Sequence, residues 1–204
     1  MPVHGAGATA RFVQKRLHFF RACVPGLGIS LLLFPCVLLA GEILDSSVTH
    51  DGTVYRLSIS ARVDAPLAVV YRSITDFSNL AAINPSIEES QVIASQGADR
   101  QRVRSVIRVC ILVFCKRVEQ VQDVTLVDQR TVVATMVPGA GDFRAGSARW
   151  ELTAADTGTG LHFTEVFEPD FWVPPLIGPW LIEKQLVREV AETVMYIEML
   201  ADEQ

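Results

Sequence analysis

The sequence contains few of the residues that hold a small chain together without a core. Its four cysteines are too few for a disulfide scaffold at a length of 204 residues. Its four histidines show none of the short Cys and His spacings of a structural zinc site, so no metal is expected. Glycine (13) and proline (10) are scarce and half of the residues are apolar, which excludes a disordered or low-complexity chain. We therefore expect one globular domain with a hydrophobic core, plus a short appendage.

Acidic residues are missing from the first forty positions, which carry four basic residues between Arg11 and Arg21. Of the 18 basic residues, 14 therefore lie beyond residue 40, together with all 23 acidic ones, and this part of the chain has a net charge of about −9. Such a charge is repelled by the phosphates of DNA and RNA. Nucleic acid is therefore not expected as a partner.

The basic N-terminal region leads into an uncharged apolar run of about 16 residues, 24–39, followed by Ala40 and Gly41. This order is typical of a signal peptide. The run contains two prolines and is shorter than the roughly 20 residues that span a bilayer as one helix. We interpret residues 1–40 as a signal peptide cleaved after Ala40. An uncleaved membrane anchor remains the alternative, because Leu38 stands where a small residue is expected. In both cases the protein is predicted to be exported, with the periplasm as the expected compartment.

Strand patterns dominate the rest of the chain. Residues 41–52 are interpreted as a linker, and residues 53–204 as the domain. Strict alternation of apolar and polar residues predicts a half-buried strand over 53–63, and two short helices are expected between Asp64 and Pro85. Six further strands are predicted, separated by short turns, at 87–95, 100–111, 116–127, 131–137, 143–154 and 160–168.

Connections this short permit only antiparallel neighbours. After Pro179 an amphipathic pattern predicts a long helix to about Ala201, long enough to cross a whole sheet. The expected fold class is therefore α+β, with a curved seven-stranded antiparallel sheet wrapped around a long C-terminal helix. Seven strands form a sheet that is larger than one helix can cover. The space between the sheet and the helix is therefore either filled by large side chains or left as a cavity.

Three segments of the chain carry a resemblance to a known family: 63–66 (VDAP) with 69–71 (VVY), 74–77 (ITDF) running to 84–87 (NPSI), and 168–175 (EPDFWVPP). They resemble the helix-grip fold of the START-like (SRPBCC) superfamily, in its polyketide cyclase and coenzyme Q-binding branch, and the resemblance covers about residues 53–201. It implies a cavity for a hydrophobic ligand between the sheet and the long helix. It does not imply one chemistry, because members of this superfamily bind lipids, quinones, hormones or polyketides and only some are enzymes.

The alternation also selects candidate ligand-binding residues. Leu161, Phe163, Glu165 and Phe167 share one face of their strand, so Glu165 is the best candidate for a polar anchor, with a pKa raised by burial. Two alternatives remain open for Glu165: a bulge that turns it outward, or an ion pair with an arginine. The residues predicted to bind the ligand are Tyr71, Trp150, Leu152, Phe163, Glu165, Phe167, Trp172 and Trp180.

Cys110 and Cys115 flank the tip of a predicted hairpin, where they either form a disulfide in an oxidising compartment or remain as free thiols. The apolar residues 111–114 between them are surrounded by arginines and a lysine. An exposed apolar tip among basic residues predicts contact with an anionic membrane surface. The alternative is that residues 111–114 continue a buried strand and the basic residues form its solvated face.

The sequence contains no convergent set of catalytic residues and no sign of a cofactor, so it favours binding over catalysis. We expect an exported binding protein or carrier for a lipid, an isoprenoid or a quinone-like molecule. Two alternatives remain open. One is an enzyme of the polyketide cyclase or dehydrase type that uses Glu165 or Tyr71 for acid–base chemistry. The other is a protein-interaction module without a ligand.

Overall fold

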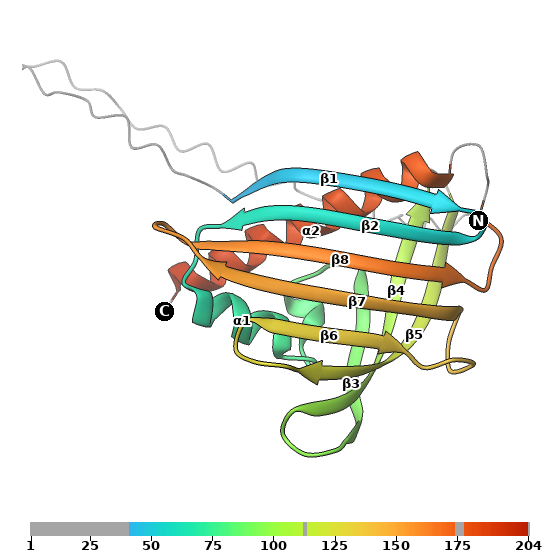
Figure 1. Ribbon diagram of the computed structural model, residues 1–204, viewed down its shortest axis with the longest axis horizontal. Helices are drawn as coiled ribbons and strands as arrows, with labels where there is room; N and C mark the ends of the chain where they lie inside the picture. Colours follow the sequence, from blue (N-terminus) through green and yellow to red (C-terminus); the bar gives the residue numbers. More distant parts are fainter. Residues whose placement is uncertain (1–40, 112–113, 174–177, 204) are drawn as a thin grey trace, which may run out of the picture. The chain divides into compact units, whose positions relative to one another are not determined.

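Strands precede and follow two short helical segments, and a long helix ends the chain. The computed structural model describes residues 41–111, 114–173 and 178–203 (Figure 1). In chain order its elements are β1 (Glu42–Asp51), β2 (Val54–Val63), α1 (Leu67–Thr75), the 3₁₀ helix η1 (Leu80–Ala82), β3 (Ile87–Ser95), β4 (Arg100–Ile111), β5 (Phe114–Leu126), β6 (Thr131–Met136), β7 (Phe143–Ala154), β8 (Thr159–Pro169) and α2 (Gly178–Asp202).

The strands form one sheet in the order β1-β2-β8-β7-β6-β5-β4-β3, and every neighbouring pair is antiparallel. All but one of these pairs are consecutive in the chain, as short turns require. The exception is β2 with β8, which joins the start of the domain to its last strand. Figure 1 shows the sheet curving, with α2 lying across one of its faces. The expected α+β class, antiparallel sheet and C-terminal helix are confirmed.

The sheet of the described residues has eight strands and not the predicted seven, because residues 42–51, assigned to a linker, form β1. β1 is an edge strand that is exposed at most positions, so it lacks the alternation of a half-buried strand. The missed signal is the pair Asp51 and Gly52. Gly52 has φ 57° in the β1–β2 turn, a conformation that favours glycine, and Asp-Gly is a strong hairpin signal.

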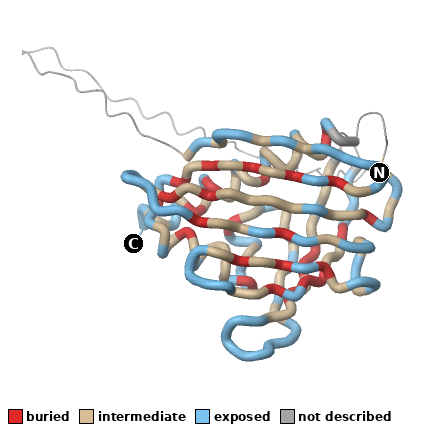
Figure 2. Tube along the Cα trace, viewed as in Figure 1, coloured by how far each residue is buried: buried red, intermediate tan, exposed pale blue. Residues whose placement is uncertain are grey.

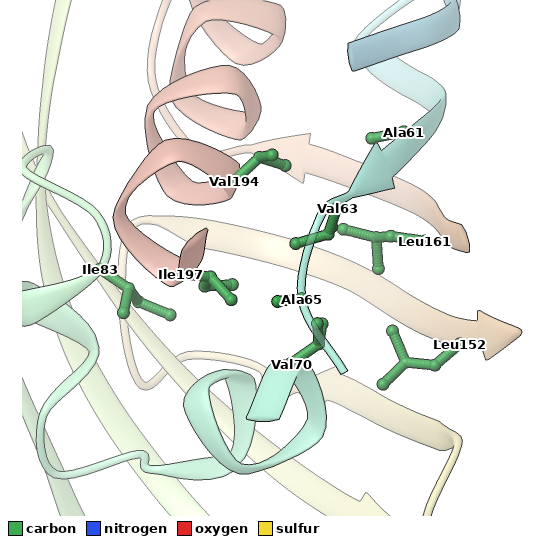
Figure 3. Packing of buried hydrophobic residues seen from close by; sticks show 9 residues of the cluster. All are labelled: Ala61, Val63, Ala65, Val70, Ile83, Leu152, Leu161, Val194 and Ile197. Atoms are coloured by element: carbon green, nitrogen blue, oxygen red, sulfur yellow. The ribbon is translucent and has the colours of Figure 1, made fainter. Parts of the chain in front are cut away.

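One cluster of buried hydrophobic residues joins β2, β7 and β8 to α1 and α2 (Figures 2 and 3). Val63, Val70 and Ile197 are fully buried there, one each from β2, α1 and α2. Alternation in β2 supplies Ala61 and Val63 from the same face of that strand. Replacing Ile197 by alanine would leave a cavity and cost about 2 to 5 kcal/mol. This cluster fixes the C-terminal half of α2 against the sheet.

Glu198 connects three parts of the domain close to this core. Its carboxylate accepts hydrogen bonds from the backbone N–H of Gly41 (3.0 Å) and from that of Asp64 (2.7 Å). It thereby joins the last turns of α2 to the start of β1 and the end of β2. Within the described ranges, no helix combines the length and apolar character needed to cross a membrane.

Candidate functional site

A cavity of about 220 Å³ lies between α2, the inner face of the sheet and the segment from α1 to η1. Most of its wall is apolar, because alternate residues of the curved strands turn inward and α2 contributes Leu186 and Val190. The other apolar residues of the wall are Ile74, Phe77, Leu80, Ile83, Ile87, Val103, Ile107, Val124, Val132, Trp150, Leu161 and Phe163.

Trp150 and Phe163 form the aromatic part of this wall. They are directly opposite each other on β7 and β8, and their ring centroids lie 5.0 Å apart with the planes tilted by 31°. Aromatic pairs across neighbouring strands stabilise a sheet and present a broad apolar surface to one side. Here that surface faces the cavity.

Glu165 projects into the same cavity from β8. The pairing of β8 with β2 and with β7 runs through Glu165 without a bulge, and no described arginine contacts its carboxylate. Neither alternative left open by the sequence therefore holds. The Glu165 side chain is partly buried and lines the cavity. Burial, followed by the nearby charge of Glu189, raises the pKa of Glu165 to about 7.

Glu189, on α2, is a second cavity carboxyl that the sequence analysis did not identify. It is 9% exposed and accepts a hydrogen bond of 2.7 Å from the side-chain amide of Gln185. Burial raises its pKa, and hydrogen bonds from Gln185 and Ser86 partly oppose this effect. The signal was its spacing: Glu189 follows Leu186 by three residues and precedes Thr193 by four, which places it on the inward face of the helix.

The remaining polar residues of the wall are uncharged. They are Asn84, Ser105, Gln120, Gln122 and Thr193. Gln122 is only 8% exposed, and no described residue makes a hydrogen bond with its side-chain amide. The described wall contains no lysine, arginine or histidine, and the described residues include no group of three side chains suited to a metal ion.

A sheet curved over a long helix, with an apolar cavity between them, agrees with a match in the sequence. Residues 55–195 match the family described as polyketide cyclase / dehydrase and lipid transport. The chain belongs to this family. Membership supports one of two kinds of function, the binding of a hydrophobic ligand or a cyclase- or dehydrase-like activity. No curated protein matches the chain.

Solved structures show the same fold at low sequence identity. TTHA0849 from Thermus thermophilus is 23% identical, with a TM-score of 0.58 over 73% of this chain and 99% of that one. The ZhuI aromatase/cyclase from Streptomyces sp. R1128 is 16% identical, with a TM-score of 0.56 over 73% and 94%. A START superfamily protein from Mycobacterium smegmatis is 14% identical, with a TM-score of 0.56 over 72% and 97%. The predicted START-like fold is confirmed.

Within this family member, only three of the eight predicted ligand-binding residues line the cavity: Trp150, Phe163 and Glu165. Tyr71 and Leu152 lie outside its lining and pack into the apolar core, Leu152 at 3% exposed. Burial, followed by the charges of Asp128 and Asp99, raises the pKa of the Tyr71 hydroxyl, so the hydroxyl is a weaker acid than usual.

The other three predicted ligand-binding residues also lie outside the cavity lining. Phe167 shares the inward face of β8, but its ring stacks on Tyr55 with centroids 5.5 Å apart and meets the ring of Phe143 edge-on at 6.0 Å. Trp172 and Trp180 are 78% and 61% exposed. In the first turn of α2 it is Leu181 that is buried, which leaves Trp180 in solvent. These two tryptophans are therefore not part of the cavity wall, and their contact with a ligand stays a prediction.

Cys110 and Cys115 are paired residues of β4 and β5, and a disulfide joins them. The basic residues nearby have acidic partners: Arg102 pairs with Asp123, Arg104 with Glu89 and Glu119, Arg108 and Arg117 with Glu88, and Lys116 with Asp142. These partners reduce the attraction to an anionic membrane on which the predicted contact depended. Residues 112–113 of the apolar tip lie outside the described residues, and its contact with a membrane stays a prediction.

Proposed function

We propose that the protein binds a small hydrophobic or amphipathic molecule, such as a lipid, an isoprenoid or a quinone-like compound, in the cavity beneath α2 and carries it. The observation that supports this best is the cavity itself. Its wall is mostly apolar and carries a few inward polar groups, which is the usual composition of a small-molecule site.

The size of the cavity limits the ligand. Its volume of about 220 Å³ is below the roughly 300 to 1,000 Å³ of sites for drug-sized molecules. A compact molecule fits whole, whereas a long acyl or polyprenyl chain enters only in part unless α2 moves. We therefore expect a small ligand, or the end of a longer one.

Native mass spectrometry of the protein purified from its own cells tests this proposal. We expect a retained small molecule that is released on denaturation and extracts into organic solvent. The variant Trp150→Ala removes a ring that lines the cavity. The matched control is Trp180→Ala, which removes a ring that lies in solvent. Loss of the molecule from Trp150→Ala alone supports a cavity ligand. Absence of any bound molecule in all three proteins, with no uptake of added lipids, contradicts it.

A second candidate function, an enzyme of the cyclase or dehydrase type, is favoured by Glu165. A carboxyl group with a pKa near 7 inside a mostly apolar cavity is suited to general acid–base catalysis at neutral pH. The test is to incubate the co-purified ligand with wild type and Glu165→Gln, and to follow loss of water or ring closure by chromatography and mass spectrometry. Conversion by wild type alone supports an enzyme, and an unchanged ligand in both supports a carrier.

We propose in addition that the protein is exported and that its leader is removed after Ala40. The disulfide between Cys110 and Cys115 supports an oxidising compartment. The contact of Gly41 with Glu198 supports the cleavage position, because cleavage would convert the Gly41 N–H, 3.0 Å from the carboxylate, into a positively charged ammonium. N-terminal sequencing of the protein from the periplasmic fraction should begin at Gly41. A chain that begins at Met1 in the cytoplasm would contradict export.

A further inference from the structure

The two carboxyl groups of the cavity differ from carboxylates on the outer face of the sheet in having no basic hydrogen-bond partner. On the outer face, Asp123 and Glu119 each accept hydrogen bonds from an arginine at 2.7 and 2.6 Å. Glu165 has no hydrogen-bond partner among the described residues, and Glu189 has only neutral hydrogen-bond donors. These outer carboxylates are paired with cations, and the inner ones are not.

Only α2 and β8 contribute charged groups near the two cavity carboxyls, Glu165 and Glu189, among the described residues. Glu165 lies on β8 and Glu189 lies on α2. Two charged neighbours on α2 act on Glu189: Glu192 raises its pKa and Arg188 lowers it. Arg188 is an exposed residue whose guanidinium donates to the Gln185 side chain, and it is not part of the cavity wall. The other elements that form the wall contribute no titratable side chain to it. The described wall is therefore acidic and lacks any positive charge.

Gln122, on β5, points independently to a polar ligand. It is more than nine-tenths buried, lines the cavity, and makes no side-chain hydrogen bond with a described residue. No fully buried polar side-chain atom of the described residues lacks a partner, so the amide of Gln122 is accessible from the cavity and free to bond a ligand. A ligand with a polar end would satisfy this amide.

We propose that the ligand carries a basic nitrogen, and that the cavity binds a small amphipathic amine whose ammonium group lies between Glu165 and Glu189 while its apolar part contacts Trp150 and Phe163. This inference rests on the proposed function and specifies the ligand's polar end. A protonated amine supplies the one kind of group that the wall lacks, and each N–H donates to a carboxylate oxygen or to the Gln122 carbonyl. An anionic ligand, such as a fatty acid, would place a third negative charge in the cavity and is selected against.

The test compares three ligands of equal chain length that differ only in the polar end: octylamine, octanol and octanoate. Each displaces the fluorescent probe N-phenyl-naphthylamine from the full mature protein at about pH 8, where Glu165 is largely ionised and the amine is protonated. We expect octylamine to bind about tenfold or more tightly than octanol, the ratio typical of a charged hydrogen-bonded contact, and octanoate to bind most weakly.

The matched variants are Glu165→Gln and Glu189→Gln in the cavity, with Glu151→Gln as the control on the outer face of neighbouring β7, where Arg149 holds the carboxylate at 2.9 Å. Each cavity variant should reduce the affinity for octylamine more than the affinity for octanol, and a cooperative urea denaturation transition shows that the variant is folded. Glu151→Gln should behave as wild type. Lowering the pH from about 8 to about 5 should weaken octylamine alone, because Glu165 then takes up a proton.

Binding of octanol as tight as that of octylamine, or a preference for the amine that survives in both cavity variants, overturns the inference and leaves the proposed function standing. Failure of all three ligands to displace the probe, or of the probe to bind at all, overturns the proposed function and the inference together.

Discussion

The ring centroid of Trp150 lies 5.0 Å from that of Phe163 on the neighbouring strand, and both rings line the cavity. In a solid core each ring would be surrounded by packed atoms on every side. Here part of each ring contacts open volume. This difference makes the two aromatic residues measurable indicators of the cavity.

Trp150→Ala should destabilise the protein by less than the roughly 3 to 5 kcal/mol expected for truncation of a fully packed aromatic, because part of its surface already faces a cavity. Leu152→Ala, two residues along the same strand and 3% exposed, is the packed control and should cost about 2 to 5 kcal/mol. Urea denaturation midpoints provide both values. A full aromatic cost for Trp150→Ala would indicate that the ring is ordinary core.

Glu165→Gln should stabilise the protein at neutral and alkaline pH. The carboxyl has an ordinary pKa of 4.5 when unfolded and about 7 when folded. Between these values the folded state binds more protons than the unfolded state, so the contribution of Glu165 to stability is present below pH 4.5 and is lost as the pH rises to about 7. The variant should gain up to about 3 kcal/mol over wild type at about pH 8 and nothing at about pH 4.

Urea denaturation at several pH values measures this difference, with Glu151→Gln as the control carboxyl on the outer face. For Glu151 the arginine partner Arg149 lowers the pKa, so Glu151→Gln should destabilise slightly, if at all, at the same pH. A constant difference between wild type and Glu165→Gln across the pH range would contradict the buried position of Glu165.

Glu198→Ala should destabilise the domain by about 2 kcal/mol, because two backbone N–H groups, of Gly41 and Asp64, lose a charged acceptor. Glu183→Ala on the same helix is the control, since Glu183 makes no hydrogen bond with the described residues. Hydrogen exchange should show faster opening of β1 in the first variant only. Equal stability of the two variants would show that Glu198 does not hold β1.

The disulfide predicts that Cys110 and Cys115 are protected from thiol reagents. In the mature protein, denatured without reductant, neither should be labelled, and both should be labelled after reduction. Peptide mapping by mass spectrometry distinguishes these two cysteines from any others. Full labelling of both before reduction would refute the bridge.

Most of the sheet was predictable, because apolar and polar residues alternate along its strands and short turns connect them. β7, expected at 143–154, has those same bounds, and the long helix was placed within a few residues of α2. β1 was missed because an exposed edge strand needs no apolar face and therefore leaves no periodic signal. Only Asp51 and Gly52 in its turn indicated the hairpin.

Site residues on strands were predictable, because alternation fixes which side chains point inward. Site residues on α2 were not, because the rotation of a helix about its axis decides which side chains are buried. Phe163 and Glu165 lie on one face of a regular strand, so their inward position followed from their spacing. Trp180 lies in the first turn of α2, where a shift of one residue exchanges a buried for an exposed position, and Leu181 occupies the buried one. Glu189 was missed because a charged residue is usually assigned to the solvent face, although its spacing places it inside.

The central claim, that the cavity binds a hydrophobic ligand, is tested most directly by titrating the mature protein with N-phenyl-naphthylamine and following its fluorescence. We predict saturable binding of one probe per chain that octanol displaces, that Phe163→Ala weakens, and that Trp180→Ala leaves unchanged. A wild-type protein that shows no saturable binding, together with a full packed-core cost for Trp150→Ala, would contradict the account.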